Sequence, residues 1–107
     1  MVKKFMVAAR EAEIPEGEAR VVELEGTRIA LCRVDGALYA IEDVCTHDDG
    51  PLGEGYLDGP EIECPRHGAR FDVRTGAVRS MPAVTPVKTF PLRVERGEVL
   101  VEIDAED

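Results

Sequence analysis

The sequence Cys45-Thr46-His47 is followed, after sixteen residues, by Cys64-Pro65-Arg66-His67, and these two stretches contain both histidines of the chain. They also contain two of its three cysteines. Thiolates and imidazoles are the side chains that most often bind zinc and iron–sulfur clusters in proteins. The spacing, C-x-H-x16-C-x2-H, therefore predicts two loops that together supply a complete set of metal ligands.

Two kinds of metal centre use two cysteines and two histidines. Structural zinc binds them tetrahedrally, but zinc-finger sequences usually place both cysteines in the first pair and both histidines in the second. Here each pair holds one residue of each kind. A [2Fe–2S] cluster in which two histidines replace two cysteines on one iron fits this alternation, because each loop then gives one ligand to each iron. The order favours the cluster, with a zinc-stabilised interaction module as the alternative.

The two motifs resemble those of the Rieske family, in the stretches Cys-Thr-His at 45–47 and Cys-Pro-Arg-His-Gly at 64–68. The flanking stretches 50–56, 68–76 and 86–94 look like the soluble ferredoxins of that family. The resemblance implies one Rieske [2Fe–2S] cluster. It also implies the ligands: Cys45 and Cys64 on the inner iron, His47 and His67 on the outer iron.

The same resemblance implies a function. Soluble Rieske ferredoxins are one-electron carriers that pass electrons from a flavin-dependent ferredoxin reductase to a terminal oxygenase, typically in ring-hydroxylating systems. We therefore expect an electron-transfer protein that is not itself an enzyme. The alternative is a Rieske-type small subunit of a larger reductase, such as assimilatory nitrite reductase. Those subunits often lack the ligands, whereas this chain has all four, which favours the free carrier.

Composition limits the partners and the compartment. The chain has 107 residues, enough for one domain, and no apolar run approaches the roughly 20 residues of a membrane span. A net charge of −9 argues against nucleic acid and anionic membranes and suits a basic protein partner. Cys32 has no partner left for a disulfide once the other two cysteines are ligands. We expect a cytoplasmic monomer.

The pattern of residues predicts an all-β protein, because the apolar runs are short, β-branched and interrupted by glycine or proline. Asp35-Gly36 and Arg96-Gly97 are typical hairpin turns, and residues 9–14 suit one helical turn that ends before Pro15. The predicted strands are Lys3–Ala8, Ala19–Leu24, Arg28–Val34, Ala37–Ile41, Glu61–Glu63, Arg70–Asp72, Val87–Val94 and Val99–Ile103.

These strands suggest a single domain, residues 1–107, with two nested parts, and the resemblance implies that it is a Rieske domain. A Rieske-like antiparallel β-sandwich or barrel base comprises residues 1–42 and 84–107. A small cluster-binding subdomain, residues 43–83, is inserted into it. If the two histidines bind the outer iron, partners should dock over residues 46–49, 66–68 and 80–83. Asp48 and Asp49 would then contribute acidic groups to that surface.

The surroundings of the sulfurs bear on the redox potential. High-potential Rieske proteins resemble Cys-x-x-His-Gly-Ser, with a tyrosine two residues after the serine, and their hydroxyls donate hydrogen bonds to cluster sulfurs. Ala69 and Phe71 occupy these places here and have no hydroxyl. Those proteins also carry one further cysteine in each loop, and the two form a disulfide. Gly50 and Arg66 stand at these positions.

We therefore predict a midpoint potential at the low end of the Rieske range, near roughly −150 mV. Ala69→Ser and Phe71→Tyr should each raise it, because a hydrogen bond to sulfur stabilises the more negative reduced state. Protein-film voltammetry measures both effects. A wild-type midpoint well above zero at neutral pH would contradict this interpretation of the sulfur environment.

Overall fold

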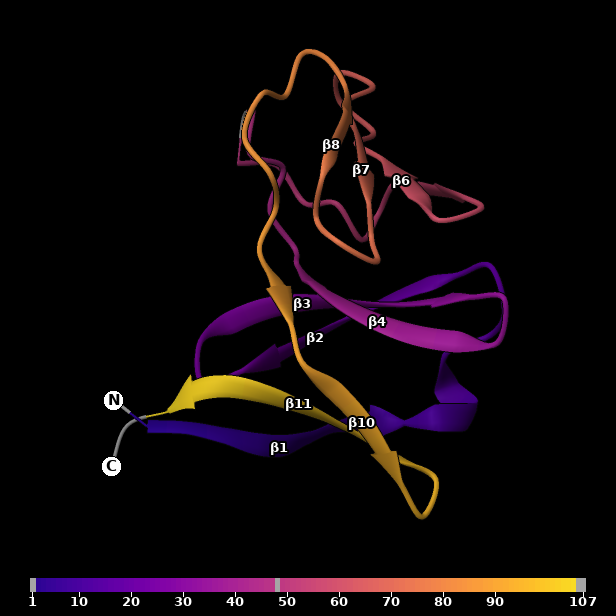
Figure 1. Ribbon diagram of the computed structural model, residues 1–107, viewed down its shortest axis with the longest axis vertical. Coiled ribbons are helices and arrows are strands. Elements are labelled where there is room, and N and C mark those ends of the chain that lie inside the picture. Colours follow the sequence, from indigo (N-terminus) through magenta and orange to yellow (C-terminus); the bar gives the residue numbers. More distant parts are fainter. Residues whose placement is uncertain (1, 48, 106–107) are drawn as a thin grey trace.

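The computed structural model describes residues 2–47 and 49–105 (Figure 1). Within them, eleven strands pair in antiparallel fashion, and Glu11–Glu13 form a single 3-10 helix, so the predicted all-β fold is confirmed. No helix in this part of the chain is long and apolar enough to cross a membrane. The strands are β1 (Val2–Arg10), β2 (Ala19–Leu24), β3 (Thr27–Val34), β4 (Ala37–Glu42), β5 (Tyr56–Asp58), β6 (Glu61–Glu63), β7 (Arg70–Asp72), β8 (Val78–Ser80), β9 (Thr89–Phe90), β10 (Leu92–Glu95) and β11 (Glu98–Ala105).

The strands form three sheets. The first has the order β1-β11-β10, the second β2-β3-β4-β9, and the third β5-β6-β7-β8. Val2 pairs with Ala105, which brings the first and last described residues together at one side of the molecule (Figure 1). The third sheet lies at the opposite end of the view, and the chain enters it after β4 and leaves it before β9 (Figure 1).

Strand β3 is buried on both faces and separates two hydrophobic cores. Ile29 and Leu31 pack into the core shared with β11, whereas Ala30 and Cys32 pack into the core shared with the third sheet. This division follows from the two-residue period of a strand, which sends alternate side chains to opposite faces. The second sheet is therefore a middle layer, and the third sheet rests on a fully packed surface.

Three two-residue turns set the strand register. Glu25-Gly26, Asp35-Gly36 and Arg96-Gly97 all have positive φ at both residues, between 51° and 81°. Turns of this kind match the right-handed twist of the strands that they join, and glycine at the second place avoids backbone strain. The two hairpin turns predicted from the sequence are confirmed. The turn at Glu25-Gly26 repeats the same pattern between β2 and β3.

Two predictions about the strands were incomplete. Strands β5 and β8, of three residues each, were not predicted. The prediction of one continuous strand over Val87–Val94 is wrong. Pro91 separates two strands there, β9 of the second sheet and β10 of the first. Proline has no N–H to donate to a ladder, so the chain changes sheets at this residue.

An ion-paired carboxylate stabilises the third sheet. The side chain of Asp72 is only 2% exposed, and its two oxygens accept hydrogen bonds from Arg74 Nε at 3.1 Å and Nη2 at 2.9 Å. Arg79 Nη2 lies 3.3 Å from the same carboxylate. The hydrogen bonds from Arg74, aided by Arg79, lower the pKa of Asp72 to about 2, although burial opposes them.

We predict that Asp72→Asn lowers the free energy of unfolding at pH 7 by about 1–3 kcal/mol, because hydrogen bonds to a charged group are lost. A depressed carboxylate pKa stabilises the fold above the unfolded-state pKa, and this contribution is lost as the pH falls toward 2. The difference between wild type and variant in urea titrations should therefore shrink between pH 4 and 2. Glu95→Gln is the control, since the Glu95–Arg93 pair is half exposed and worth little. Equal losses in both variants would contradict the prediction.

Candidate metal centre

The four predicted ligands lie on two loops. Loop 1, residues 45–50, follows β4, and loop 2, residues 64–69, joins β6 to β7. A cysteine begins each loop. The histidine follows at the third residue of loop 1 and at the fourth residue of loop 2.

Each cysteine donates a backbone hydrogen bond across its own loop. The N–H of Cys45 donates to the carbonyl of Gly50 at 2.7 Å, and the N–H of Cys64 donates to the carbonyl of Ala69 at 2.7 Å. Donor and acceptor are five residues apart in both cases. The two loops are therefore closed at the same place by the same bond.

A second pair of bonds repeats this correspondence. The carbonyl of Cys45 accepts from the N–H of Asp49 at 2.7 Å, and the carbonyl of Cys64 accepts from the N–H of Gly68 at 3.0 Å. Asp49 and Gly68 both have left-handed backbones, with φ of 62° and 76°. Glycine adopts this conformation freely, and aspartate is among the few other residues that do so often. Loops of different sequence thus share the same two hydrogen bonds at the cysteine backbone.

The donor side chains divide into a buried pair and an exposed pair. Cys45 is 0% exposed and Cys64 is 1% exposed. His47 and His67 are exposed, and their ring centroids lie 5.2 Å apart with the planes at 88°. The structure therefore brings together one histidine from each loop at the surface, above cysteines that belong to one buried cluster.

This arrangement fits the predicted group. A [2Fe–2S] cluster with mixed ligands needs two thiolates on one iron and two imidazoles on the other. The buried sulfurs and the exposed rings supply these two kinds of donor at two depths, each loop giving one of each. Among the residues that the structure describes, no three His, Cys, Asp or Glu side chains form a compact site for a single metal ion.

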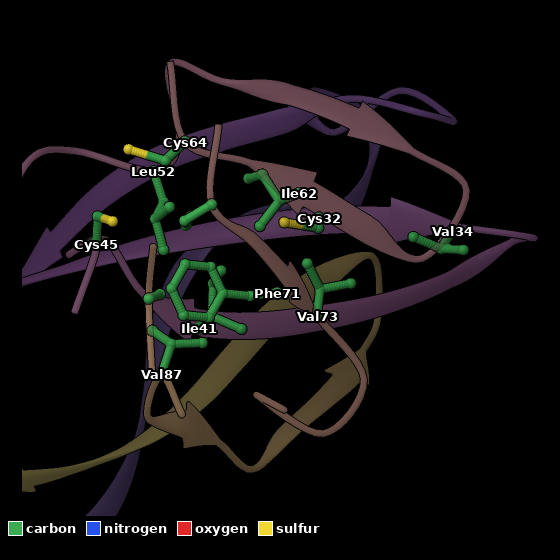
Figure 2. Close-up of a cluster of buried hydrophobic side chains, with 13 residues drawn as sticks. Cys32, Val34, Ile41, Cys45, Leu52, Ile62, Cys64, Phe71, Val73 and Val87 are labelled. Carbon is green, nitrogen blue, oxygen red and sulfur yellow. The ribbon is translucent and has the colours of Figure 1, made fainter. Parts of the chain in front are cut away.

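The third cysteine is separate from this pair. Figure 2 shows the sulfurs of Cys45 and Cys64 at the same end of the buried cluster, with Cys32 farther inside beside Ile62. Cys32 is fully buried on β3, and burial, with a smaller effect of the Asp43 charge, raises the pKa of its thiol to about 12. Since the thiolate is the form that binds metals, a thiol held protonated in this way is poorly suited to be a ligand.

Ala69 and Phe71 stand where high-potential Rieske proteins have residues with hydroxyl groups. Ala69 and Phe71 are both fully buried in the cluster that contains Cys64, and Figure 2 shows Phe71 within it. Both therefore contribute apolar surface to the interior next to the second ligand loop. The redox potential inferred from them stays a prediction.

A third segment, the proline loop (residues 80–85), is fastened to both ligand loops. The hydroxyl of Thr46 donates to the carbonyl of Thr85 at 2.5 Å. At the other end, the hydroxyl of Ser80 accepts from the N–H of Arg70 at 3.1 Å and lies 3.4 Å from the carbonyl of Gly68. Thr46 was predicted only as part of the docking surface over residues 46–49, and its hydrogen bond to Thr85 was not predicted. A polar side chain between two predicted ligands could have suggested a hydrogen bond. The sequence could not identify the partner, because Thr85 lies 39 residues away.

Between these two attachments the proline loop presents apolar side chains to solvent. Met81 is 80% exposed and Val84 is 82% exposed. Met81 and the exposed histidines lie on segments where docking was predicted, and Val84 directly follows the segment 80–83. Asp49 is exposed on loop 1, and Asp48 lies outside the described residues.

Comparison with known proteins identifies the family. A family model described as the Rieske [2Fe-2S] domain matches residues 4–91. The chain belongs to the Rieske [2Fe–2S] family. It is 40% identical, over 96% of its length, to the ferredoxin component of the naphthalene 1,2-dioxygenase system of Pseudomonas aeruginosa, and the match covers 99% of that protein.

Solved Rieske structures agree with this assignment. The Sphingomonas yanoikuyae B1 ferredoxin matches 94% of this chain and all of its own length, with a TM-score of 0.90 and 35% identity. A chain in the complex of reduced oxygenase and oxidized ferredoxin of carbazole 1,9a-dioxygenase matches 91% of this chain, and 91% of its own length, with a TM-score of 0.86 and 40% identity.

The predicted Rieske family, its [2Fe–2S] cofactor and the electron-transfer class are thereby confirmed. The comparisons do not favour a small subunit of nitrite reductase, since the relatives are named as ferredoxin components of dioxygenase systems. The assignment of the four individual ligands stays a prediction.

We predict that Thr46→Val speeds amide hydrogen exchange in the proline loop, because the hydrogen bond to Thr85, worth about 1 kcal/mol, is lost. Thr85→Val is the matched control, since it keeps the backbone carbonyl that accepts this bond. Mass-spectrometric exchange on both holo variants makes the comparison. Identical exchange rates in the two variants would show that the Thr46 hydroxyl does not hold the loop.

Proposed function

We propose that this chain holds its cluster through four side chains: Cys45 and Cys64 on the inner iron, His47 and His67 on the outer iron. The observation that supports this most directly is the shared backbone geometry of the two loops, each with one buried cysteine and one exposed histidine. When bound in this way, the cluster exchanges one electron and offers no open position at iron for a substrate.

We further propose that the electron comes from a flavin-dependent ferredoxin reductase and goes to a terminal oxygenase. The names of the relatives support an oxygenase as the acceptor, since they are components of dioxygenase systems. A related ferredoxin has been solved in complex with an oxygenase. Exposed imidazole edges give the shortest route to such a partner. Electrons would therefore leave at His47 and His67.

The division of the chain into parts follows the same proposal. Residues 1–42 and 84–107 would act as a rigid base, and residues 43–83 as the cluster-binding subdomain. The packing of the third sheet on the doubly buried strand β3 supports this division. We propose a cytoplasmic monomer, for which a net charge of −9 provides mutual repulsion between copies.

The ligand assignment predicts the outcome of five substitutions. Cys45→Ser and Cys64→Ala should abolish the cluster, and His47→Ala and His67→Ala should abolish or severely reduce it, because each removes a ligand of iron. Cys32→Ala is the matched control and should keep the full spectrum. Visible absorption, electron paramagnetic resonance and iron content per chain report the result. Loss of the cluster in the Cys32 variant, with retention in a Cys45 variant, would refute the assignment.

If partners dock over acidic groups such as Asp49, the rate of electron transfer should depend on the salt concentration. The rate of electron transfer to a partner should fall as ionic strength rises, because salt screens attraction between an acidic carrier and a basic surface. Asp49→Lys, on loop 1, should slow transfer at low salt. Glu98→Lys is the control, since Glu98 is exposed on the β10–β11 hairpin, far from the third sheet (Figure 1). A rate that is flat across ionic strength would show that the charge is incidental to docking.

A further inference from the structure

Asp43 is a buried charge at the entrance to loop 1. It follows β4 directly and precedes Cys45 by two residues, and its side chain is 0% exposed. Only one other charged residue among those described, Asp72, is similarly buried. Burying a carboxylate costs free energy unless it is ion-paired and hydrogen-bonded. A buried Asp43 therefore needs partners that offset this cost.

The carboxylate connects three segments of the chain. One oxygen accepts from Arg28 on β3, with Nε at 3.2 Å and Nη2 at 2.9 Å. The other oxygen accepts from the backbone N–H of Gly53 at 2.6 Å. The N–H of Asp43 itself donates to the carbonyl of Arg28 at 2.9 Å. Both ends of the segment 43–53 are thereby tied to the middle sheet.

The contact with Gly53 depends on close packing. A β-carbon added to Gly53 would collide with the Val21 side chain and lie 3.2 Å from the Asp43 carboxylate. Only glycine allows the backbone to approach this closely. The segment that Asp43 closes contains the whole of loop 1, including two of the proposed ligands. Asp43 therefore joins the two ends of the segment that contains loop 1.

The charge of Asp43 is only partly offset. The Arg28 side chain is 55% exposed, so water screens its charge, whereas the carboxylate has no contact with solvent. After burial itself, Asp43 is the second cause that raises the pKa of Cys32 to about 12. Cys32 shares its core with Cys45 and Cys64. The negative field of Asp43 thus reaches the interior in which the proposed thiolate ligands lie.

We propose that Asp43 is a positioning residue of the metal centre, which fixes loop 1 to the base and whose buried charge keeps the midpoint potential low. A negative charge near the cluster disfavours the added electron, since the reduced state is the more negative one. This inference rests on the proposed ligand role of Cys45 and His47. It gives the low midpoint potential a second cause, separate from the absence of hydroxyl groups at Ala69 and Phe71.

The test compares four variants with wild type. Asp43→Asn keeps an oxygen that can accept from Gly53 but removes the charge, so the cluster should be retained and the midpoint potential should rise. Asp43→Ala removes both, so iron content per chain should fall. Arg28→Lys keeps both charges, so its potential should stay near that of wild type even where its melting temperature is lower. Asp72→Asn is the matched control, because Asp72 is equally buried and paired but lies at the end of β7 away from loop 2.

Protein-film voltammetry, iron analysis and thermal melting provide the readouts. An Asp43→Asn potential no higher than that of Asp72→Asn, or an equal rise in Arg28→Lys, would overturn the role of the charge. Full iron content in Asp43→Ala would overturn the positioning role, and so would a loss of iron in Asp43→Asn, which keeps the oxygen that accepts from Gly53; the asparagine variant therefore tests both roles where the alanine variant does not fold. Failure of the proposed function looks different: the four ligand variants would then keep their cluster, whatever the Asp43 variants do.

Discussion

The hydrogen bonds at the two cysteine backbones constrain everything else at the metal centre. In each loop the cysteine N–H and carbonyl are both used within the loop, which leaves the cysteine side chain pointing inward and the histidine outside. Because the two loops repeat this geometry, one buried and one exposed donor come from each. The arrangement is a property of the backbone, so loops with different residues between cysteine and histidine can provide it.

The rest of the fold holds these loops in place. Strand β3 sends side chains into two cores, and it bears both Cys32 and the Arg28 that pairs with Asp43. Two charged side chains are buried in the described structure, and both accept hydrogen bonds from arginines at the edge of solvent. Asp72 secures the third sheet, and Asp43 secures loop 1. The two ligand loops are thus supported by an ordered interior, while the proline loop between them presents apolar groups to solvent.

The fold and the site could be predicted from the sequence where a short local pattern determines the structure. The ligand spacing indicated the centre, and X-Gly pairs indicated hairpins such as Asp35-Gly36, because turn geometry depends on one or two residues. Contacts between distant segments were not predictable in this way. The bonds from Thr46 to Thr85 and from Gly53 to Asp43 join residues that no periodic pattern relates. The three-residue strand β8 takes its conformation from pairing with β7 rather than from its own residues.

The most direct test of the central claim counts the nitrogen ligands of the cluster. Electron–nuclear double resonance on the reduced holo protein, labelled with 15N at histidine only, detects nitrogen bound to the paramagnetic iron. We predict two 15N couplings strong enough for direct ligation, and the loss of one in His47→Ala or His67→Ala protein that still retains some cluster. A spectrum with no such coupling, or with only one in the wild type, would contradict a centre built from one cysteine and one histidine of each loop.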